Sequence, residues 1–150
     1  MTPVNEKVVA AKVETIQRML RGIRTLPLAT EEVLTQDFQM YSAGESMLRR
    51  ALEALLDLGR HILAKGFNNS VVEYKQIGKT LGEFDILTSG SVTLLVNMAG
   101  YRNRLTHFYD EVTPEELYRI LTTEISDIES VLGEILKWLR SNPEMIDTSL

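Results

Sequence analysis

SVTLLVNMAGYRNRLTHFYDE, the segment from Ser91 to Glu111, predicts one long helix with two apolar faces. At about 100° per residue, one face collects large apolar side chains that suit the core of a helical bundle. These are Leu94, Met98, Tyr101, Leu105, Phe108 and, just beyond, Val112. A second face collects Val92, Leu95, Val96 and Ala99. Because a surface helix needs only one apolar stripe, the second face predicts a further cover. We favour a second copy of the chain as this cover, and the second or last helix of the same chain is the alternative.

Four other segments have the apolar spacing of amphipathic helices. They run from about Asn5 to Arg24, Asp37 to Lys65, Ser70 to Leu81, and Thr113 to just before Pro143. Gly66 and Gly82 are placed as helix stops, Ser70 and Thr113 as caps, and Thr30-Glu31-Glu32 as a short turn. Short connections between long helices predict an all-α antiparallel bundle of about five helices in a single domain, residues 1–150.

The composition narrows the classes of function. The chain contains no cysteine, which excludes disulfides and thiolate catalysis and is typical of a reducing, cytoplasmic setting. No apolar run approaches the roughly 20 residues of a membrane helix, so we expect no membrane association. A net charge of −5 argues against a broad surface that coats nucleic acid. It leaves room for a small basic site that engages one RNA backbone.

A cluster of polar groups follows the second apolar face toward the end of the same helix. Asn103 and His107 are four residues apart, Arg102 and Tyr109 are seven apart, and Thr106 lies between them. Arginine can form bidentate hydrogen bonds with a phosphate, and histidine titrates near neutral pH. RNA supplies its own nucleophile, the 2′-hydroxyl, so an Arg and a His doubled in a dimer suit its cleavage. The alternative is a C-terminal helix cap, in which basic side chains favour the negative end of the dipole.

The segment RNRLTHFYD, residues 102–110, resembles the R-x4-H-x-Y motif of HEPN-domain proteins, specifically the HepT-like toxins. The segment ALEALLDLGRHI, residues 51–62, resembles the second helix of that family. Gly100-Tyr101 before the motif and Thr113-Pro114-Glu115 after it resemble the family's flanking residues. The similarity extends over most of the chain, from Val8 to Leu139.

This resemblance implies a compact all-α homodimer with metal-independent endoribonuclease activity at the dimer cleft, toxic to the cell. Arg102 and His107 would be the catalytic pair, with Asn103 and Thr106 in supporting positions. The usual partner is an MNT-type nucleotidyltransferase antitoxin, and Tyr109 would be the target of its AMP addition. The rival hypothesis is a non-catalytic helical dimer module that binds a nucleotidyltransferase partner or a nucleotide.

Other polar residues have weaker claims. Asp57 and His61 are four residues apart, and either extend the cleft or have a structural role. Arg49-Arg50 and the group Arg18, Arg21 and Arg24 either border an RNA path or form solvated helix faces. No His, Asp and Glu set has the spacing of metal ligands, so we predict neither a metal nor a cofactor.

Overall fold

The computed structural model describes residues 3–107 and 112–148, with the His107 side chain excepted. Four long helices dominate these ranges: α1 (Glu6–Thr25), α3 (Phe38–Phe67), α5 (Ser89–His107) and α7 (Ile125–Ser141). Shorter elements are β1 (Val4–Asn5), α2 (Glu32–Gln36), α4 (Tyr74–Glu83), α6 (Pro114–Arg119), the π-helical turn η1 (Ile120–Glu124), the 3-10 turn η2 (Pro143–Met145) and β2 (Ile146–Asp147). The predicted all-α class is confirmed.

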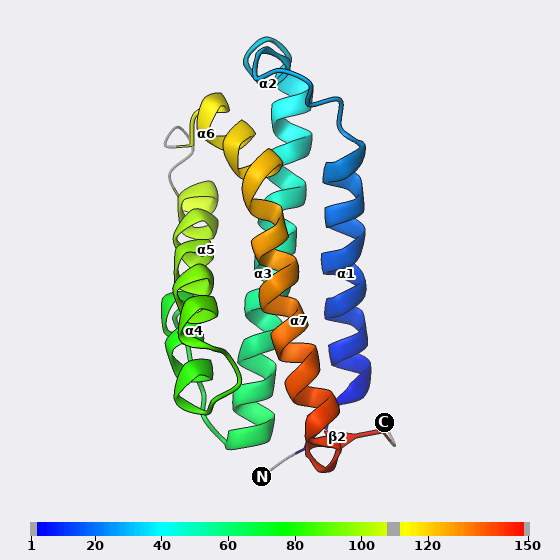
Figure 1. Ribbon diagram of the computed structural model, residues 1–150, viewed down its shortest axis with the longest axis vertical. Coiled ribbons are helices and arrows are strands. Elements are labelled where there is room, and N and C mark those ends of the chain that lie inside the picture. The colour runs from blue at the N-terminus through cyan, green and yellow to red at the C-terminus, as the bar shows by residue number, and fades with distance from the viewer. Residues whose placement is uncertain (1–2, 108–111, 149–150) are drawn as a thin grey trace.

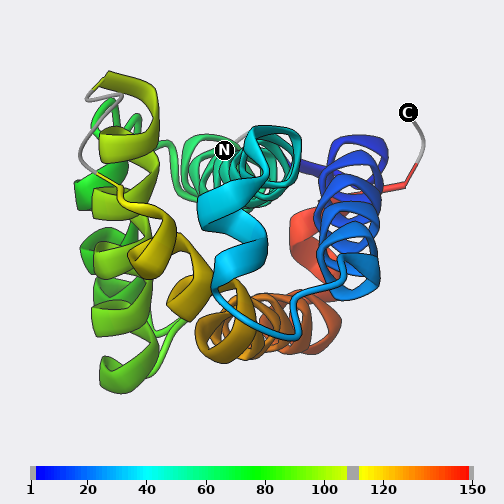
Figure 2. The same cartoon turned by 90° about the horizontal axis from the view of Figure 1, so that it is seen from above.

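Helix α3 is the centre of the bundle. The long helices run alternately up and down the molecule, as predicted, and α4 lies beside α5 (Figure 1). Seen from above, α1 and α5 lie on opposite sides of α3, while α7 closes the bundle (Figure 2). Eight apolar side chains of α3 are at most 1% exposed: Leu48, Ala51, Leu52, Leu55, Leu56, Leu58, Ile62 and Leu63. Their burial makes α3 the main hydrophobic support of the fold.

Three polar caps fix where α1, α3 and α6 begin. The Asn5 side chain accepts hydrogen bonds from the backbone N–H groups of Lys7 and Val8, which starts α1. Asp37 does the same for α3, and Thr113 Oγ1 accepts from the backbone N–H of Glu116 at 3.1 Å. The predicted starts near Asn5, Asp37 and Thr113 are therefore confirmed.

Other predicted boundaries are wrong. Gly66 does not stop α3, because it is buried in the helix where a Cβ would lie 3.2 Å from Met145 Cε. The helix ends instead at Phe67, and the C-cap residue that follows it, Asn68, adopts the left-handed φ of 51°. Ser70 does not cap α4, which begins after Glu73, and Gly82 lies inside that helix. By contrast, the short turn predicted to open at Thr30-Glu31-Glu32 is present as the five-residue α2, although none of the described side chains caps its start.

The single helix predicted from Thr113 to Pro143 is interrupted by η1. Thr122 Oγ1 donates to the carbonyl of Tyr118 at 2.7 Å, and Thr123 Oγ1 donates to that of Arg119 at 2.5 Å. Hydroxyl groups that return to the preceding turn compete with regular helix bonding. The chain therefore passes from α6 to α7 through a wider π turn rather than along one regular α-helix.

The second apolar face of α5 is covered by α4 of the same chain. Leu95 and Ala99 are fully buried within one chain. A Cβ on Gly78 would lie 3.3 Å from the Val92 carbonyl oxygen and 3.4 Å from Val96 Cγ2, so the two helices approach closely. The prediction that a second chain covers this face is wrong for Leu95 and Ala99, which are buried within one chain, and α4 was not among the helices suggested as the alternative. Because Gly78 has no side chain, α4 can pack closely enough against α5 to cover this face.

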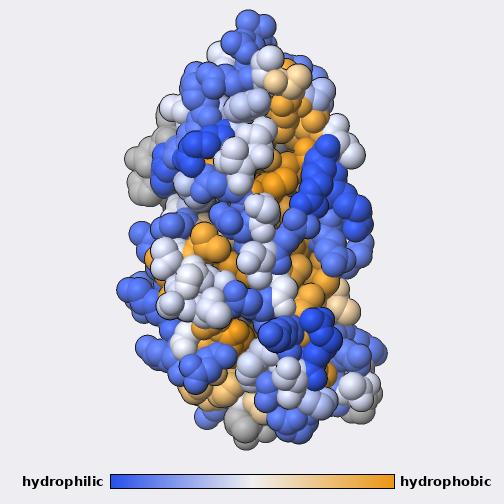
Figure 3. Space-filling view, viewed as in Figure 1, coloured by the Kyte–Doolittle hydropathy of each residue, from blue (hydrophilic) through white to orange (hydrophobic). Residues whose placement is uncertain are grey.

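Both ends of the described chain meet at one end of the bundle. β1 and β2 pair in parallel, with Val4 opposite Ile146 and Asn5 opposite Asp147. In the space-filling view, apolar side chains form a lengthwise seam broken by hydrophilic ones (Figure 3). A shallow groove between α1 and α7 includes Leu20, Leu132 and Leu136. None of the described helices has the length and apolar content to cross a membrane.

Candidate functional site

Arg102 projects from α5 toward α3 and α4, where two side chains hold it. Its Nε lies 3.4 Å from Glu53 Oε1 on α3. Its guanidinium carbon lies 4.6 Å from the ring centroid of Tyr74 on α4, the distance of a cation–π contact. Its Nη1 donates to Asn103 Oδ1 at 3.3 Å, which brings these two predicted site residues together. Only 20% of the Arg102 side chain is exposed, so its orientation is largely set before any ligand arrives.

Tyr74 is shared by a second arginine. The guanidinium carbon of Arg60 also lies 4.6 Å from the Tyr74 ring centroid. The Tyr74 hydroxyl donates to Asp57 Oδ1 at 2.8 Å. Burial raises the pKa of Tyr74, and the hydrogen bond to Asp57 raises it further, so the phenol stays protonated and keeps donating. Tyr74 thus joins α3, α4 and α5 at one point.

An open pocket of about 500 Å³ lies over this arrangement. Its lining is polar and contains three cationic side chains, with the 84% exposed Val72 at one side. The lining residues are Arg60, Val72, Glu73, Tyr74, Lys75, Arg102 and Asn103. Arg102 and Asn103 therefore face a cavity that is large enough for part of a nucleotide.

Thr106 faces a different pocket, of about 420 Å³. That pocket is lined by Phe38, Tyr41, Ser42, Glu45, Arg49, Arg104, Leu105, Thr106 and Val112. The Thr106 Oγ1 atom is buried without a hydrogen-bond partner among the described residues. Arg49 lines this second pocket and pairs with Glu45 at 3.0 Å and with Glu53 at 3.5 Å. The single polar face predicted from the helical wheel is therefore divided in two.

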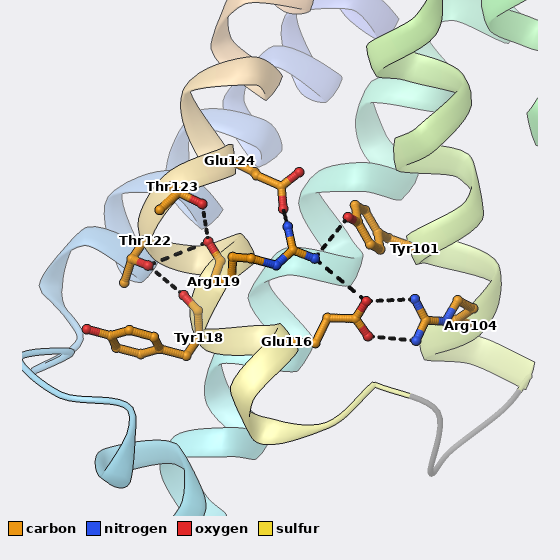
Figure 4. A network of polar contacts seen from close by, with 8 residues as sticks. All are labelled: Tyr101, Arg104, Glu116, Tyr118, Arg119, Thr122, Thr123 and Glu124. Carbon is orange, nitrogen blue, oxygen red and sulfur yellow. Dashed lines mark hydrogen bonds and ion pairs between the residues drawn. The ribbon is translucent and has the colours of Figure 1, made fainter.

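Arg104, for which the sequence suggested no role, anchors α5 to α6 (Figure 4). Its two terminal nitrogens bind both oxygens of Glu116, at 2.6 Å and 2.9 Å. Arg119 extends the network: it lies 3.8 Å from Glu116, pairs with Glu124, and donates to the Tyr101 hydroxyl at 3.4 Å. This network fixes the end of α5 that carries the candidate site.

Arg104→Gln is expected to lower the free energy of unfolding by about 1 kcal/mol at neutral pH, after allowance for solvent screening. The hydrogen bonds from Arg104 hold the pKa of Glu116 below its ordinary 4.5. A depressed carboxyl pKa stabilises the fold above the unfolded value, and this contribution disappears as pH falls through the lower folded value. Urea unfolding of wild type and variant should therefore differ at pH 7 and converge in acid. A difference that does not change with pH would contradict the assignment.

His107 is the last residue of α5, one turn beyond Asn103. Tyr109 lies outside the described residues, so its predicted role remains a prediction. His61, by contrast, is half-buried near the N-terminus, where its Nε2 accepts a hydrogen bond from the Asn5 backbone N–H at 3.0 Å. Burial lowers the pKa of His61, and Lys65 and Lys12 lower it further, which keeps it a neutral acceptor. Asp57 belongs to the pocket through Tyr74, and His61 has a structural role.

The outer arginines of α1 form contacts away from the pocket. Arg21 lies 3.7 Å from Glu14, and Arg24 pairs with Glu129 on α7. Within residues 3–107 and 112–148, no three His, Cys, Asp or Glu side chains are grouped to hold a metal ion.

Sequence reasoning named Asp57 but missed other residues that hold Arg102 or line the pocket, among them Glu53, Arg60, Tyr74 and Lys75. Glu53 and Arg60 are seven residues apart and Asp57 is four from Glu53, a spacing that places all three on one side of α3. A polar stripe on a mostly buried helix could have been used to predict that this side of α3 faces the site. No sequence pattern could have identified Tyr74 and Lys75, because their position beside Arg102 depends on how α4 packs.

The structure is an antiparallel helical bundle with Arg102 and His107 on one helix, which is the arrangement that the resemblance to HEPN-domain proteins implies. A family model described as "Ribonuclease HepT-like" matches residues 14–135, and the chain belongs to this family.

Individual relatives agree with this assignment. The "tRNA nuclease HepT" of Aphanizomenon flos-aquae (strain 2012/KM1/D3) is 22% identical over 139 residues, which cover 93% of this chain and 95% of the relative. The tri-AMPylated Shewanella oneidensis HEPN toxin, solved in complex with MNT antitoxin, has a TM-score of 0.78 at 22% identity and covers 87% of this chain and 97% of its own. A cytosolic Bacillus subtilis protein of unknown function has a TM-score of 0.79 at 17% identity and covers 95% of each chain. At these identities, the solved structures show a shared fold.

Proposed function

We propose that this protein is the toxin of a HEPN/MNT-type toxin–antitoxin system and cleaves RNA without a metal ion. The observation that carries the proposal is the held arginine: Glu53 and Tyr74 orient Arg102 at an open basic pocket on the helix that ends at His107. The name of the Aphanizomenon relative, a tRNA nuclease, supports the same activity class.

The chemistry is an in-line transesterification. The 2′-oxygen of a ribose attacks the adjacent phosphorus, the bond from phosphorus to the 5′-oxygen breaks, and a 2′,3′-cyclic phosphate forms. A base removes the 2′-hydroxyl proton and an acid protonates the departing 5′-oxygen, roles that suit two imidazoles contributed by two copies of His107. Arg102 stabilises charge on the phosphorane, with Asn103 and Thr106 in support.

The dimer and the antitoxin belong to the same proposal. A two-fold homodimer would bring two copies of the Arg102–His107 segment to one cleft. Control would come from an MNT-type nucleotidyltransferase that transfers AMP from ATP to the Tyr109 hydroxyl and releases pyrophosphate. The added negative charge would repel RNA phosphate and silence the toxin. We place the system in the cytoplasm, as stated for the Bacillus subtilis neighbour.

The purified protein is expected to cleave single-stranded RNA in excess EDTA and to leave 2′,3′-cyclic or 3′-phosphate ends. DNA of the same sequence should remain intact, because it lacks the 2′-hydroxyl. Gel separation and end-group analysis of the products measure both results. Intact RNA under conditions in which the protein is folded would contradict the activity and favour the non-catalytic helical module.

A further inference from the structure

Three cationic side chains from three different helices meet at the pocket beside Arg102. Arg60 comes from α3, Lys75 from the first turn of α4, and Arg102 from α5. The chain as a whole carries a net charge of −5, so this positive group is a local exception on an acidic protein. Such a pocket attracts an anion selectively.

Most nearby carboxylates are already engaged. Glu53 lies between Arg49 and Arg102, and Asp57 accepts the Tyr74 hydroxyl. Asp57 also lies 3.7 Å from Arg60 and 3.9 Å from Lys12. Among the lining residues, Glu73 is the one carboxylate, and it is exposed. The side chains that line the pocket therefore carry three positive charges and one negative charge, while Glu53 and Asp57 pair with Arg102 and Arg60 from behind and leave Lys75 as the lining cation without such a carboxylate among the described residues.

The contacts favour a phosphate over a base as the ligand. The Tyr74 ring already has two guanidinium groups at 4.6 Å from its centroid, which leaves it poorly suited as a stacking platform. Arg102 Nε is paired with Glu53, and Arg60 Nη2 donates to the Val72 carbonyl at 3.2 Å, so a ligand would meet the outer guanidinium nitrogens and the Lys75 ammonium rather than the buried Nε atoms. Terminal guanidinium nitrogens and a lysine ammonium suit the several acceptor oxygens of a phosphate.

We propose that Arg60 and Lys75 form a second phosphate site beside Arg102, and that this site holds the RNA backbone next to the phosphate being cleaved. This inference rests on the proposed ribonuclease function and adds a subsite to it. The guanidinium carbons of Arg60 and Arg102 each lie 4.6 Å from the centroid of the Tyr74 ring. The distance between these two carbons is therefore at most twice that value. Tyr74 thereby sets the spacing between the cleaved phosphate and its neighbour.

Charge substitutions of opposite sign test the site. The probe is a short fluorescein-labelled 2′-O-methyl RNA, which cannot be cleaved because its 2′-oxygen is blocked, titrated at several KCl concentrations. Lys75→Gln is expected to weaken binding about fivefold at low salt, the effect of one charge about 4 Å from a phosphate oxygen. It should also reduce the salt slope by about 0.7, the loss of one backbone contact to a single strand. Glu73→Gln should tighten binding by a similar factor, because it removes the opposing carboxylate.

Lys79→Gln is the matched control. Lys79 is exposed on the same helix, one turn beyond Lys75, and does not line the pocket. It should leave affinity and salt slope unchanged. Equal losses in Lys75→Gln and Lys79→Gln would indicate diffuse attraction and overturn the site, as would a Glu73→Gln variant that binds no more tightly.

Cleavage of natural RNA by the same variants separates the two proposals. Normal cleavage with no difference among the variants in binding or salt slope overturns the phosphate site and leaves the ribonuclease function intact. The expected order of affinities without any cleavage by wild type supports the site and overturns the function. Failure of wild type to bind RNA overturns both.

Discussion

His107→Ala is expected to slow RNA cleavage by about 10²–10⁴-fold, the range for loss of a general acid–base group. Arg102→Ala should slow it by about 10²–10³-fold, as for a lost donor to developing charge. Arg102→Lys should recover part of this activity, because lysine restores the positive charge but not the bidentate hydrogen bonding of the planar guanidinium. Single-turnover cleavage of a labelled RNA measures all three.

His61→Gln supplies the internal control, because the chain has only two histidines. Glutamine keeps an acceptor for the Asn5 backbone N–H, so cleavage should remain close to wild type. Circular dichroism and sedimentation should show the same helicity and oligomeric state in every variant. Rapid cleavage by both His107→Ala and Arg102→Ala would remove these residues from the catalytic site.

Leu95→Ala is expected to lower the free energy of unfolding by about 2–5 kcal/mol, the range for removing a buried leucine from a packed core. Leu95 is fully buried between α4 and α5 of a single chain. Its loss should therefore leave the dimer dissociation constant unchanged. Urea unfolding at fixed protein concentration and sedimentation equilibrium give the two quantities.

Thr93→Ala is the control for this second prediction, because Thr93 is exposed on the same helix. It should change stability by no more than about 0.5 kcal/mol. The opposite pattern for Leu95→Ala, a weakened dimer with little loss of stability, would return the second apolar face to an interface between chains.

The sequence predicts the long helices well because their apolar stripes and polar caps are local signals. Asn5, Asp37 and Thr113 each bind backbone N–H groups within their own first turn, so their role depends on immediate neighbours alone. Gly66 misleads for the opposite reason. Its value lies in close packing against Val4 and Met145, which are distant in sequence.

In the candidate site, too, some residues could be predicted from the sequence and others could not. Arg102 and Asn103 are recognisable from the motif, and the structure places them together at one pocket. Tyr74 is not recognisable, because its meeting with Arg60 and Arg102 depends on how α4 packs beside α3 and α5. The two-chain interpretation of the second apolar face fails on the same point. Periodicity reports that a face is covered but not by which element.

The pairing of β1 with β2 makes the described chain nearly a closed ring. Val4 and Ile146 are neighbours in space although almost the whole sequence separates them. A short linker between the two ends would therefore leave every helix in place, and new ends could be opened in the exposed stretch at residues 29–32. Such a rearranged protein would carry a fusion partner at the opposite pole of the bundle.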